Sequence, residues 1–521
     1  MQHPCDGDAA TQTRLDARLV PAALTSWAVT AAGIWWPLGN VVGAVCAVGS
    51  MFGVLLWRAA HRSSPLRAIG VGVVVAGVVG AGFGFAIALR ANAVAHHPIV
   101  AAFGTTEQVV VTPSESALAL GGGRLMFRGA LRQLGDDQIS GRVVVFAPAR
   151  DFSAAMVGQP MRFRARIARP SRRDLTVAVL NAIGAPAMGQ AAPANRAAHA
   201  VRAEFAASAR LVLPADQAAM LPALVLGDMS TVSTVTSQEF RTAGLTHLTA
   251  VSGANVTIVC GAVLFTSRLI GPRAAVALAG AALVLFVIVV QPTASVLRAA
   301  VMGAIALMGL LSSRRRQAIP ALAATVLVLM IVTPQLAVDV GLALSVVATA
   351  ALVVIAPVWS RRLVAAGWPK PLSDAVCVAC AAQLVTAPLI AGISGRVSVV
   401  GAAANLAVAA LIAPITVLGS AAGALCVFWS TAAQLLIRFT GPELWWVLRI
   451  AHWAAGVPAA SVPVPSGIPG VLLVGAAAIL TTVLWRRRWF RAAMAVAAVG
   501  LLAWSLSGLL AGADGAVGCC G

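Results

Sequence analysis

The sequence has no tyrosine, a single lysine (Lys370) and few charged residues of any kind. Charged side chains make up 10% of the 521 residues, whereas a typical soluble protein carries about 25%. Apolar residues make up 60% of the chain and the mean hydropathy is +0.90, more apolar surface than a soluble core of this length can bury. These deficits exclude an ordinary soluble protein and predict an integral membrane protein.

Motifs of the common enzyme classes are also missing. The sequence contains no Gly-x-x-x-x-Gly-Lys-Ser/Thr phosphate loop, no His-Glu-x-x-His or His-x-His-x-Asp-His zinc pattern and no Gly-x-Ser-x-Gly nucleophile turn. Cys377 and Cys380 have metal-ligand spacing, but without a second pair inside an apolar segment they are better interpreted as packing residues. We therefore expect no catalytic residue, no metal site and no cofactor.

Long apolar segments are what the sequence does contain. A membrane-crossing helix needs about 20 apolar residues, and the segments predict a polytopic α-helical membrane protein with about 10–13 transmembrane helices. Residues 397–429 form either one bent helix or two, and residues 434–456 either cross or lie flat. The segments are 20–36, 39–57, 68–89, 245–265, 274–290, 294–311, 317–333, 336–359, 375–394, 397–429, 466–485 and 492–510.

Basic clusters recur between these segments, at roughly every second loop. Cytoplasmic loops of membrane proteins retain Arg and Lys, so the clusters predict the cytoplasmic side and place residues 90–243 outside. Membrane topology thus accounts for much of the net charge of +20. The clusters are Arg58, Arg62 and Arg67; Arg268 and Arg273; Arg314 to Arg316; Arg361, Arg362 and Lys370; and Arg486 to Arg488.

The segment 90–194 departs from the apolar pattern and predicts a small external β domain. Residues 158–170 alternate strictly, with Arg162, Arg164 and Arg166 on one face. This arginine face either follows a phosphate backbone or is simply a solvated strand face, and few aromatic residues are present to stack on bases. Four more candidate strands, at 109–113, 124–134, 141–148 and 175–184, bring the number to that of an OB-like barrel.

Residues 195–243 predict amphipathic helices at the outer membrane interface, because apolar residues recur at helical spacing but charges interrupt them. The expected organisation is a cytoplasmic leader (1–18), N-terminal transmembrane helices (19–89), the external OB-like domain (90–194), interfacial helices (195–243), a second transmembrane block (244–510) and a tail (511–521).

Polar side chains occur inside the apolar segments, where a charge costs roughly 2.5–3.5 kcal/mol on insertion scales. Thr249, Ser252 and Asn255 recur every three residues along a predicted helix, although Ser252-Gly253 also permits a helix break of the kind that membranes tolerate beside a cavity or within protein. Taken singly, each residue has a structural explanation: Ser and Thr bond to carbonyls of their own helix, Asn405 bonds between helices, and Asp339 pairs with Arg298 or caps a helix. Taken together, they favour a hydrophilic passage lined by His247, Thr249, Ser252, Asn255, Arg298, Asp339, Gln383 and Asn405.

Two stretches resemble the signature of the ComEC family of competence DNA-import channels. They are LVLGDMS at 224–230 and EFRTAGLTHLTAVSGANVTIV at 239–259, in which Asp228, Gly244 and Gly253 fall on motif positions. Later stretches resemble further family segments: QPTASVLRAAVM at Arg298, VDVGLALSVVAT at Ser345, AAQLVTAPLI at Gln383 and AANLAVAALIAP at Asn405. The resemblance covers about residues 20–485. It departs at Ala254-Asn255, where members commonly have Leu-His, and at Leu342-Ala343, where they have Phe-Gln.

The resemblance implies a competence-type channel domain at 244–510 that imports single-stranded DNA across the bacterial cytoplasmic membrane during natural transformation. Arg298 and the polar residues of 246–255 would offer donors to phosphates, and the external barrel would receive the DNA. Many relatives continue into a metallo-β-lactamase-like domain, whereas this chain ends at Gly521. The implied partners are therefore single-stranded DNA and the bilayer, with a separate DNA receptor, nuclease and cytoplasmic motor.

Two other functions remain open from the sequence. The same architecture suits a transporter for a small solute or ion, which would close around its cargo near the midplane. It also suits a membrane scaffold that binds DNA through its basic external domain without conducting it.

Overall fold

The computed structural model describes residues 16–36, 39–59, 65–249, 251–291, 293–311, 318–485 and 487–489, with residues 492, 493, 496 and 500. The chain divides into two compact units, which are described separately. The first unit comprises Met1–Phe103, Ala168–Ala178 and Ala304–Asp339, and the second comprises the other residues. Most of the leader 1–18, the cluster Arg314 to Arg316, most of the expected span 492–510 and the tail 511–521 lie outside the described residues.

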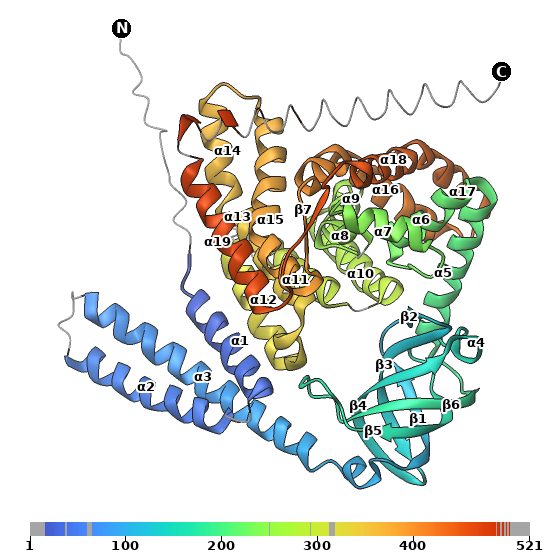
Figure 1. Ribbon diagram of the computed structural model, residues 1–521, viewed down its shortest axis with the longest axis horizontal. Coiled ribbons are helices and arrows are strands. Elements are labelled where there is room, and N and C mark those ends of the chain that lie inside the picture. The colour runs from blue at the N-terminus through green and yellow to red at the C-terminus, as the bar shows by residue number, and fades with distance from the viewer. Residues whose placement is uncertain are drawn as a thin grey trace. The chain divides into compact units, whose positions relative to one another are not determined.

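The first unit is helical (Figure 1). Its elements are α1 (Val20–Trp35), α2 (Gly39–Ala59), α3 (Pro65–Ala95), the 3-10 helix η1 (Pro98–Ala102), α12 (Ala318–Val332) and the 3-10 helix η2 (Pro334–Val338). Trp27 of α1 donates its indole N–H to the carbonyl oxygen of Ala337 at 2.8 Å, which ties α1 to η2.

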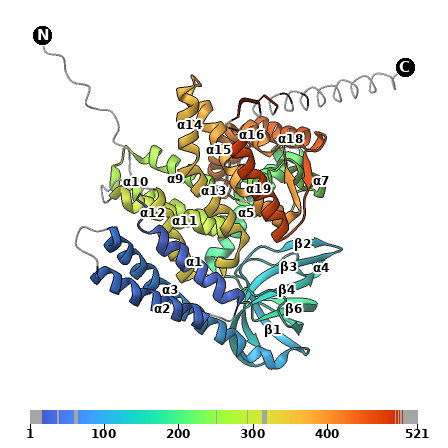
Figure 2. The same cartoon turned by 60° about the vertical axis from the view of Figure 1, so that its left-hand side comes forward.

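Helices α2 and α3 lie side by side and approach each other through glycines (Figure 2). A Cβ added to Gly84 would stand 2.7 Å from the Cα of Gly43, so no larger residue fits at position 84 unless the helices move apart. Lipid tails supply no hydrophobic drive between helices, and small residues let two backbones come close enough to gain van der Waals contact.

The strands of residues 106–188 form a small closed barrel. Each strand is hydrogen-bonded to the next in the order β1–β5–β6–β4–β3, and β3 pairs with β1 to close the ring. This is the strand order of an OB-type barrel, and β2 adds an edge strand beside β3. The elements are β1 (Thr106–Pro113), β2 (Leu118–Gly121), β3 (Arg124–Leu134), β4 (Asp137–Pro148), α4 (Ala149–Phe152), β5 (Met161–Ala168) and β6 (Ala178–Met188). The predicted small barrel is confirmed.

The barrel has an aromatic core and an arginine row on its outside. Phe127, Phe152 and Phe163 are buried together, with ring centroids 6.4 Å apart for the first pair and 5.2 Å for the second. Strand β5 alternates between buried apolar residues and exposed arginines, as the period-two pattern predicts. These three rings are therefore used in the core and cannot stack on bases.

The second unit also contains the remaining helices. They are α5 (Pro193–Val212), α6 (Ala215–Leu226), α7 (Thr234–Thr242), α8 (Thr246–Thr249), α9 (Gly253–Ser267), α10 (Pro272–Val290), α11 (Ala294–Leu311), α13 (Val340–Val354), α14 (Ala356–Ala365), α15 (Lys370–Ser394), α16 (Gly401–Leu425), α17 (Ser430–Phe439), α18 (Gly441–Gly456) and α19 (Ile468–Leu484), with the paired strands β7 (Arg396–Ser398) and β8 (Ser461–Pro463). The C-terminal half of α11 belongs to the first unit.

Seven helices of the described residues are long and apolar enough to cross a membrane, which makes the chain a multi-pass membrane protein. Of five shorter apolar helices of 10–17 residues, four coincide with further expected spans, and the fifth is α6. The expected total therefore stays a prediction. Residues 397–429 contain the single helix α16, with Pro414 inside it, and residues 434–456 are divided between α17 and α18. The seven are Gly39–Ala59, Ile69–Ala102, Pro272–Val290, Ala294–Leu311, Val340–Ala365, Lys370–Ser394 and Gly401–Leu425.

The segment expected to be interfacial is divided into helices of different character. Helix α5 carries Arg202, Glu204 and Arg210 and buries only part of its surface. In α6, by contrast, eight of 12 residues are buried. Helix α6 is therefore part of the protein interior and differs from the amphipathic surface helix that the sequence predicts.

Candidate functional site

The conspicuous stretch 246–255 is a broken helix. Helix α8 ends at Thr249 and α9 begins at Gly253, with Ser252 as its N-cap. The hydroxyl of Ser252 accepts a hydrogen bond from the backbone N–H of Asn255 at 3.4 Å and donates to Asn255 Oδ1 at 3.1 Å. Side-chain oxygens at this position satisfy N–H groups that have no partner within the helix. The break that Ser252-Gly253 permits is thus present, and the polar residues do not form one continuous helical stripe.

Asn255 fastens the break to the buried helix α6. The residue is 3% exposed, and its side-chain amide donates to the carbonyl oxygen of Leu224 at 3.1 Å. That carbonyl lies in the last turn of α6, where backbone acceptors lack partners within the helix. Asn255 is therefore a structural link between two parts of the family signature.

Arg298 of α11 reaches the same break. The residue is only 6% exposed; Nε donates to the hydroxyl of Ser345 at 2.6 Å, and Nη1 lies 3.1 Å from the sulfur of Met302. A Cβ added to Gly253 would stand 2.4 Å from Nη2 of Arg298. The guanidinium thus lies against the first residue of α9, where only glycine leaves it this space.

No carboxylate of the described residues forms an ion pair with Arg298. A buried charge in an apolar segment is costly and normally faces a partner or a wet cavity. The N-terminus of α9 adds a partial positive charge at the same place, because the first N–H groups of a helix attract anions. The break therefore combines a buried cation with a helix N-terminus, an arrangement suited to a negatively charged group.

A hydrogen bond from Ser295 also ties α11 to the break. The hydroxyl of Ser295 donates to the carbonyl oxygen of Val251 at 3.0 Å. Together with the contact between Arg298 and Gly253, it fixes the N-terminal half of α11 beside the interrupted backbone. Interrupted backbone needs such partners within a membrane protein.

Another polar cluster joins α8 to α16. The imidazole Nε2 of His247 lies 3.2 Å from Oδ1 of Asn405, a hydrogen bond across 158 residues of sequence. Nearby, Gln383 Nε2 donates to the carbonyl oxygen of Ser398 at 3.2 Å, and the Ser398 hydroxyl donates to the carbonyl oxygen of Thr242 at 2.9 Å. These hydrogen bonds bring two predicted residues, Gln383 and Asn405, close to the segment 242–247, which contains His247.

Two predicted lining residues are placed differently. Thr249 is buried, and its hydroxyl donates to the carbonyl oxygen of Thr246 at 2.9 Å. Its hydroxyl hydrogen is therefore used within its own helical turn. Asp339 is the C-cap residue of η2 and belongs to the first unit, whereas the other predicted lining residues belong to the second.

An ion pair beside this region was missed by the sequence reasoning. Arg202 of α5 lies 3.7 Å from Asp228, with the two side chains 11% and 26% exposed. Burial lowers the pKa of Arg202, while the nearby Asp228 carboxylate opposes part of that effect. Arg202 is 26 residues from Asp228 and interrupts an amphipathic pattern, so no local signal marks it as the partner of the motif aspartate.

The arginine row of the barrel is a separate basic surface. Arg162, Arg164 and Arg166 are exposed on β5, opposite Val110, Gln108 and Thr106 of β1. Successive members are two residues apart, about 6.6–6.8 Å along a strand. The row is regular and accessible, as binding to a charged backbone requires. Across the described part of the chain, no group of three His, Cys, Asp or Glu residues is placed to hold a metal ion.

Comparison with known proteins identifies the family. The family model described as "Competence protein" matches residues 224–489, just over half of the chain. The matched region begins in α6 and includes Asp228, the break between α8 and α9, Arg298, Gln383 and Asn405. No curated protein and no solved structure matches the chain. The signature stretches, the multi-pass helices and this match agree, and the chain belongs to the competence protein family.

Proposed function

We propose that this competence-family membrane protein is the channel through which single-stranded DNA crosses the bacterial cytoplasmic membrane during natural transformation. Family membership supports a role in DNA uptake, and the described helices make it a multi-pass membrane protein. In this proposal residues 90–243 face outward, and the strand moves inward past the break between α8 and α9.

The observation that carries the proposal is Arg298. It is buried within a candidate span and has no carboxylate ion-pair partner among the described residues. Its guanidinium lies at the N-terminus of α9. A phosphate passing this point would meet the guanidinium and the helix dipole together. One cation holds a phosphate weakly enough for the strand to move on, which conduction requires.

The polar groups of this conformation are bonded to one another. His247 is paired with Asn405, and Gln383 with the backbone of Ser398. We therefore take the arrangement as a closed state, in which the groups exchange these partners for phosphates when DNA enters. Replacement of His247 should then lower DNA uptake without lowering the amount of inserted protein.

The barrel would receive the DNA first. Its exposed arginines match the charge of a phosphate backbone. Because Phe127, Phe152 and Phe163 are in the core, the barrel would bind through charge rather than base stacking. This type of binding is independent of sequence and sensitive to salt.

The proposal also requires partners. A separate DNA receptor would deliver the substrate, a separate nuclease would remove the second strand and a cytoplasmic motor would pull the imported strand. Neither a metal nor a cofactor is required of the chain itself.

The proposal is tested by deleting the gene and measuring transformation with labelled DNA, with the complete chain restored as the control. We expect the deletion to abolish entry of label into the cytoplasm, while DNA bound at the cell surface remains. Unchanged import would overturn the proposal. Normal import with a loss of solute or ion uptake would identify a transporter, and normal import with loss of surface-bound DNA a scaffold.

A further inference from the structure

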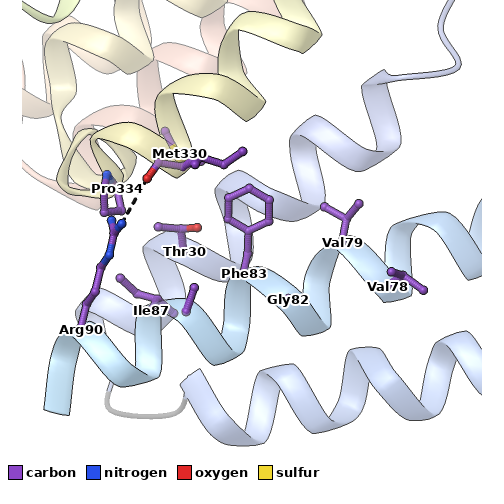
Figure 3. A pocket seen from close by; sticks show the side chains of 11 residues that line it. Thr30, Val78, Val79, Gly82, Phe83, Ile87, Arg90, Met330 and Pro334 are labelled. Atoms are coloured by element: carbon purple, nitrogen blue, oxygen red, sulfur yellow. Dashed lines mark hydrogen bonds between the residues drawn. The ribbon is translucent and has the colours of Figure 1, made fainter.

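The first unit contains a cavity of about 300 Å³ between α1, α3, α12 and η2 (Figure 3). Its wall is apolar apart from Thr30 and Arg90, and the Thr30 hydroxyl already donates to the carbonyl oxygen of Ser26 at 2.6 Å. Arg90 is thus the polar group that remains for a ligand. The lining residues are Thr30, Val78, Val79, Gly82, Phe83, Ala86, Ile87, Arg90, Met330, Ile331 and Pro334.

Arg90 lies at one end of the cavity, and Val78 and Val79 lie at the other (Figure 3). Its Nη2 donates to the carbonyl oxygen of Ile331 at 3.2 Å, at the C-terminus of α12. A guanidinium has five N–H donors. In the described part of the chain this bond uses one of them, and the Arg90 side chain is otherwise exposed.

The length of the cavity suits one leaflet of a bilayer. Val78 and Arg90 are 12 residues apart on α3, which corresponds to about 18 Å at the rise of an α-helix. One leaflet supplies half of a hydrocarbon core of about 30 Å. Since this part of α3 is within a candidate span, an apolar chain can extend along Phe83 and Val79 while Arg90 lies at the headgroup level.

We propose that this cavity binds an acyl chain of an anionic phospholipid whose phosphate is held by Arg90. The apolar wall excludes a polar solute, and the volume is at the small end of ligand sites, which suits a single chain. Arg90 supplies the complementary charge and a fork of donors that matches phosphate geometry. The bound lipid fills the space between α3 and α12, so it acts as a structural part of the first unit.

Gly82 offers a direct test of chain binding. A Cβ added to Gly82 meets nothing within 4 Å, and this glycine lines the cavity. Gly72 of the same helix also has open space but does not line it. Gly82→Leu should therefore fill the cavity, and Gly72→Leu is the matched control.

The measurement is native mass spectrometry of the purified full-length chain, titrated with phosphatidylglycerol in detergent. We expect wild type and Gly72→Leu to retain one more tightly bound phospholipid than Gly82→Leu. Equal numbers of bound lipids in all three proteins would overturn the proposal. An equal loss in Gly72→Leu and Gly82→Leu would also overturn it, because the loss would not depend on the cavity.

Arg90→Gln tests the headgroup contact in the same assay. One basic residue near a membrane surface strengthens the binding of an anionic lipid roughly fivefold. We expect Arg90→Gln to lower the preference for phosphatidylglycerol over phosphatidylcholine by about this factor, while one chain still binds. An unchanged preference would show that Arg90 only caps α12 and would overturn its assigned role.

Discussion

The guanidinium of Arg298 lies against the backbone of Gly253, so that a Cβ on this glycine would stand 2.4 Å from Nη2 of the arginine. The contact joins the family signature to a helix that begins 41 residues later in the sequence. The contact also explains why a glycine occupies this position. Gly253 begins a regular α-helix, so it is the lack of space beside Arg298, and not an unusual backbone conformation, that requires glycine. The same contact brings a buried cation to the N-terminus of α9.

Gly253→Ala should displace the guanidinium of Arg298 and lower DNA import. The added methyl group meets the end of a flexible side chain, which can move, so the protein should still insert. Within a helix, alanine is favoured over glycine by about 0.8–1.0 kcal/mol, so propensity alone predicts no loss of stability. Import of labelled DNA per inserted chain measures the effect.

Gly261→Ala is the matched control for this substitution. It lies on the same helix, and its added Cβ meets nothing within 4 Å. Equal import by the two variants would contradict the assigned role of the contact between Arg298 and Gly253.

Arg298→Gln should reduce DNA import by roughly tenfold or more, since a hydrogen bond to a charged group is worth about 1.5–3 kcal/mol. Arg298→Lys keeps the charge but loses the fork of donors, so it should retain part of the activity. Ser345→Ala removes the acceptor of Nε and should cost less, roughly fivefold. The measurement is again labelled DNA import at equal amounts of inserted protein, and Arg273→Gln, on the exposed start of α10, is the charge control. Full import by Arg298→Gln would exclude this residue from the path.

Local patterns were sufficient to predict several features of the fold. The period-two alternation of β5 fixes which side of the strand carries Arg162, Arg164 and Arg166, because successive side chains of a strand point to opposite faces. The Ser252-Gly253 sequence likewise permits the observed break. Both features depend on residues that are neighbours in the chain.

Long-range contacts could not be predicted in this way. His247 and Asn405 are separated by 158 residues, and the hydrogen bond between them depends on how α8 packs near α16. The apolar residues of α6 directly follow the charged helix α5 in the sequence, and this pattern predicts that both helices lie at the interface. The burial of α6 is set by the helices that surround it, and a single sequence does not specify them.

Replacement of Arg162, Arg164 and Arg166 by Gln should weaken binding of single-stranded DNA without changing any base preference. Each phosphate contact contributes about 0.7 to the slope of log affinity against log salt for single strands, so the slope should fall by about 2. Fluorescence anisotropy with labelled oligonucleotides and the full-length chain measures this change. Replacement of Arg124, Arg132 and Arg150, which are also exposed on the barrel domain, removes the same charge and should have a smaller effect. Equal effects of the two triple variants would indicate general attraction to the domain rather than a binding row.

Asp228→Asn should destabilise the protein, because it leaves the guanidinium of Arg202 buried without its counter-ion. The Arg202 side chain is 11% exposed and its Nη2 lies 3.7 Å from Asp228, while its buried Nη1 has no hydrogen-bond partner among the described residues. Since Asp228 is itself partly exposed, we expect a loss of about 1–3 kcal/mol, below that of a fully buried pair. Arg202→Gln combined with Asp228→Asn should recover part of this loss, since the double variant no longer contains an isolated charge. Thermal unfolding of the purified chain in detergent measures all three variants, and strictly additive effects would show that the two residues are not coupled.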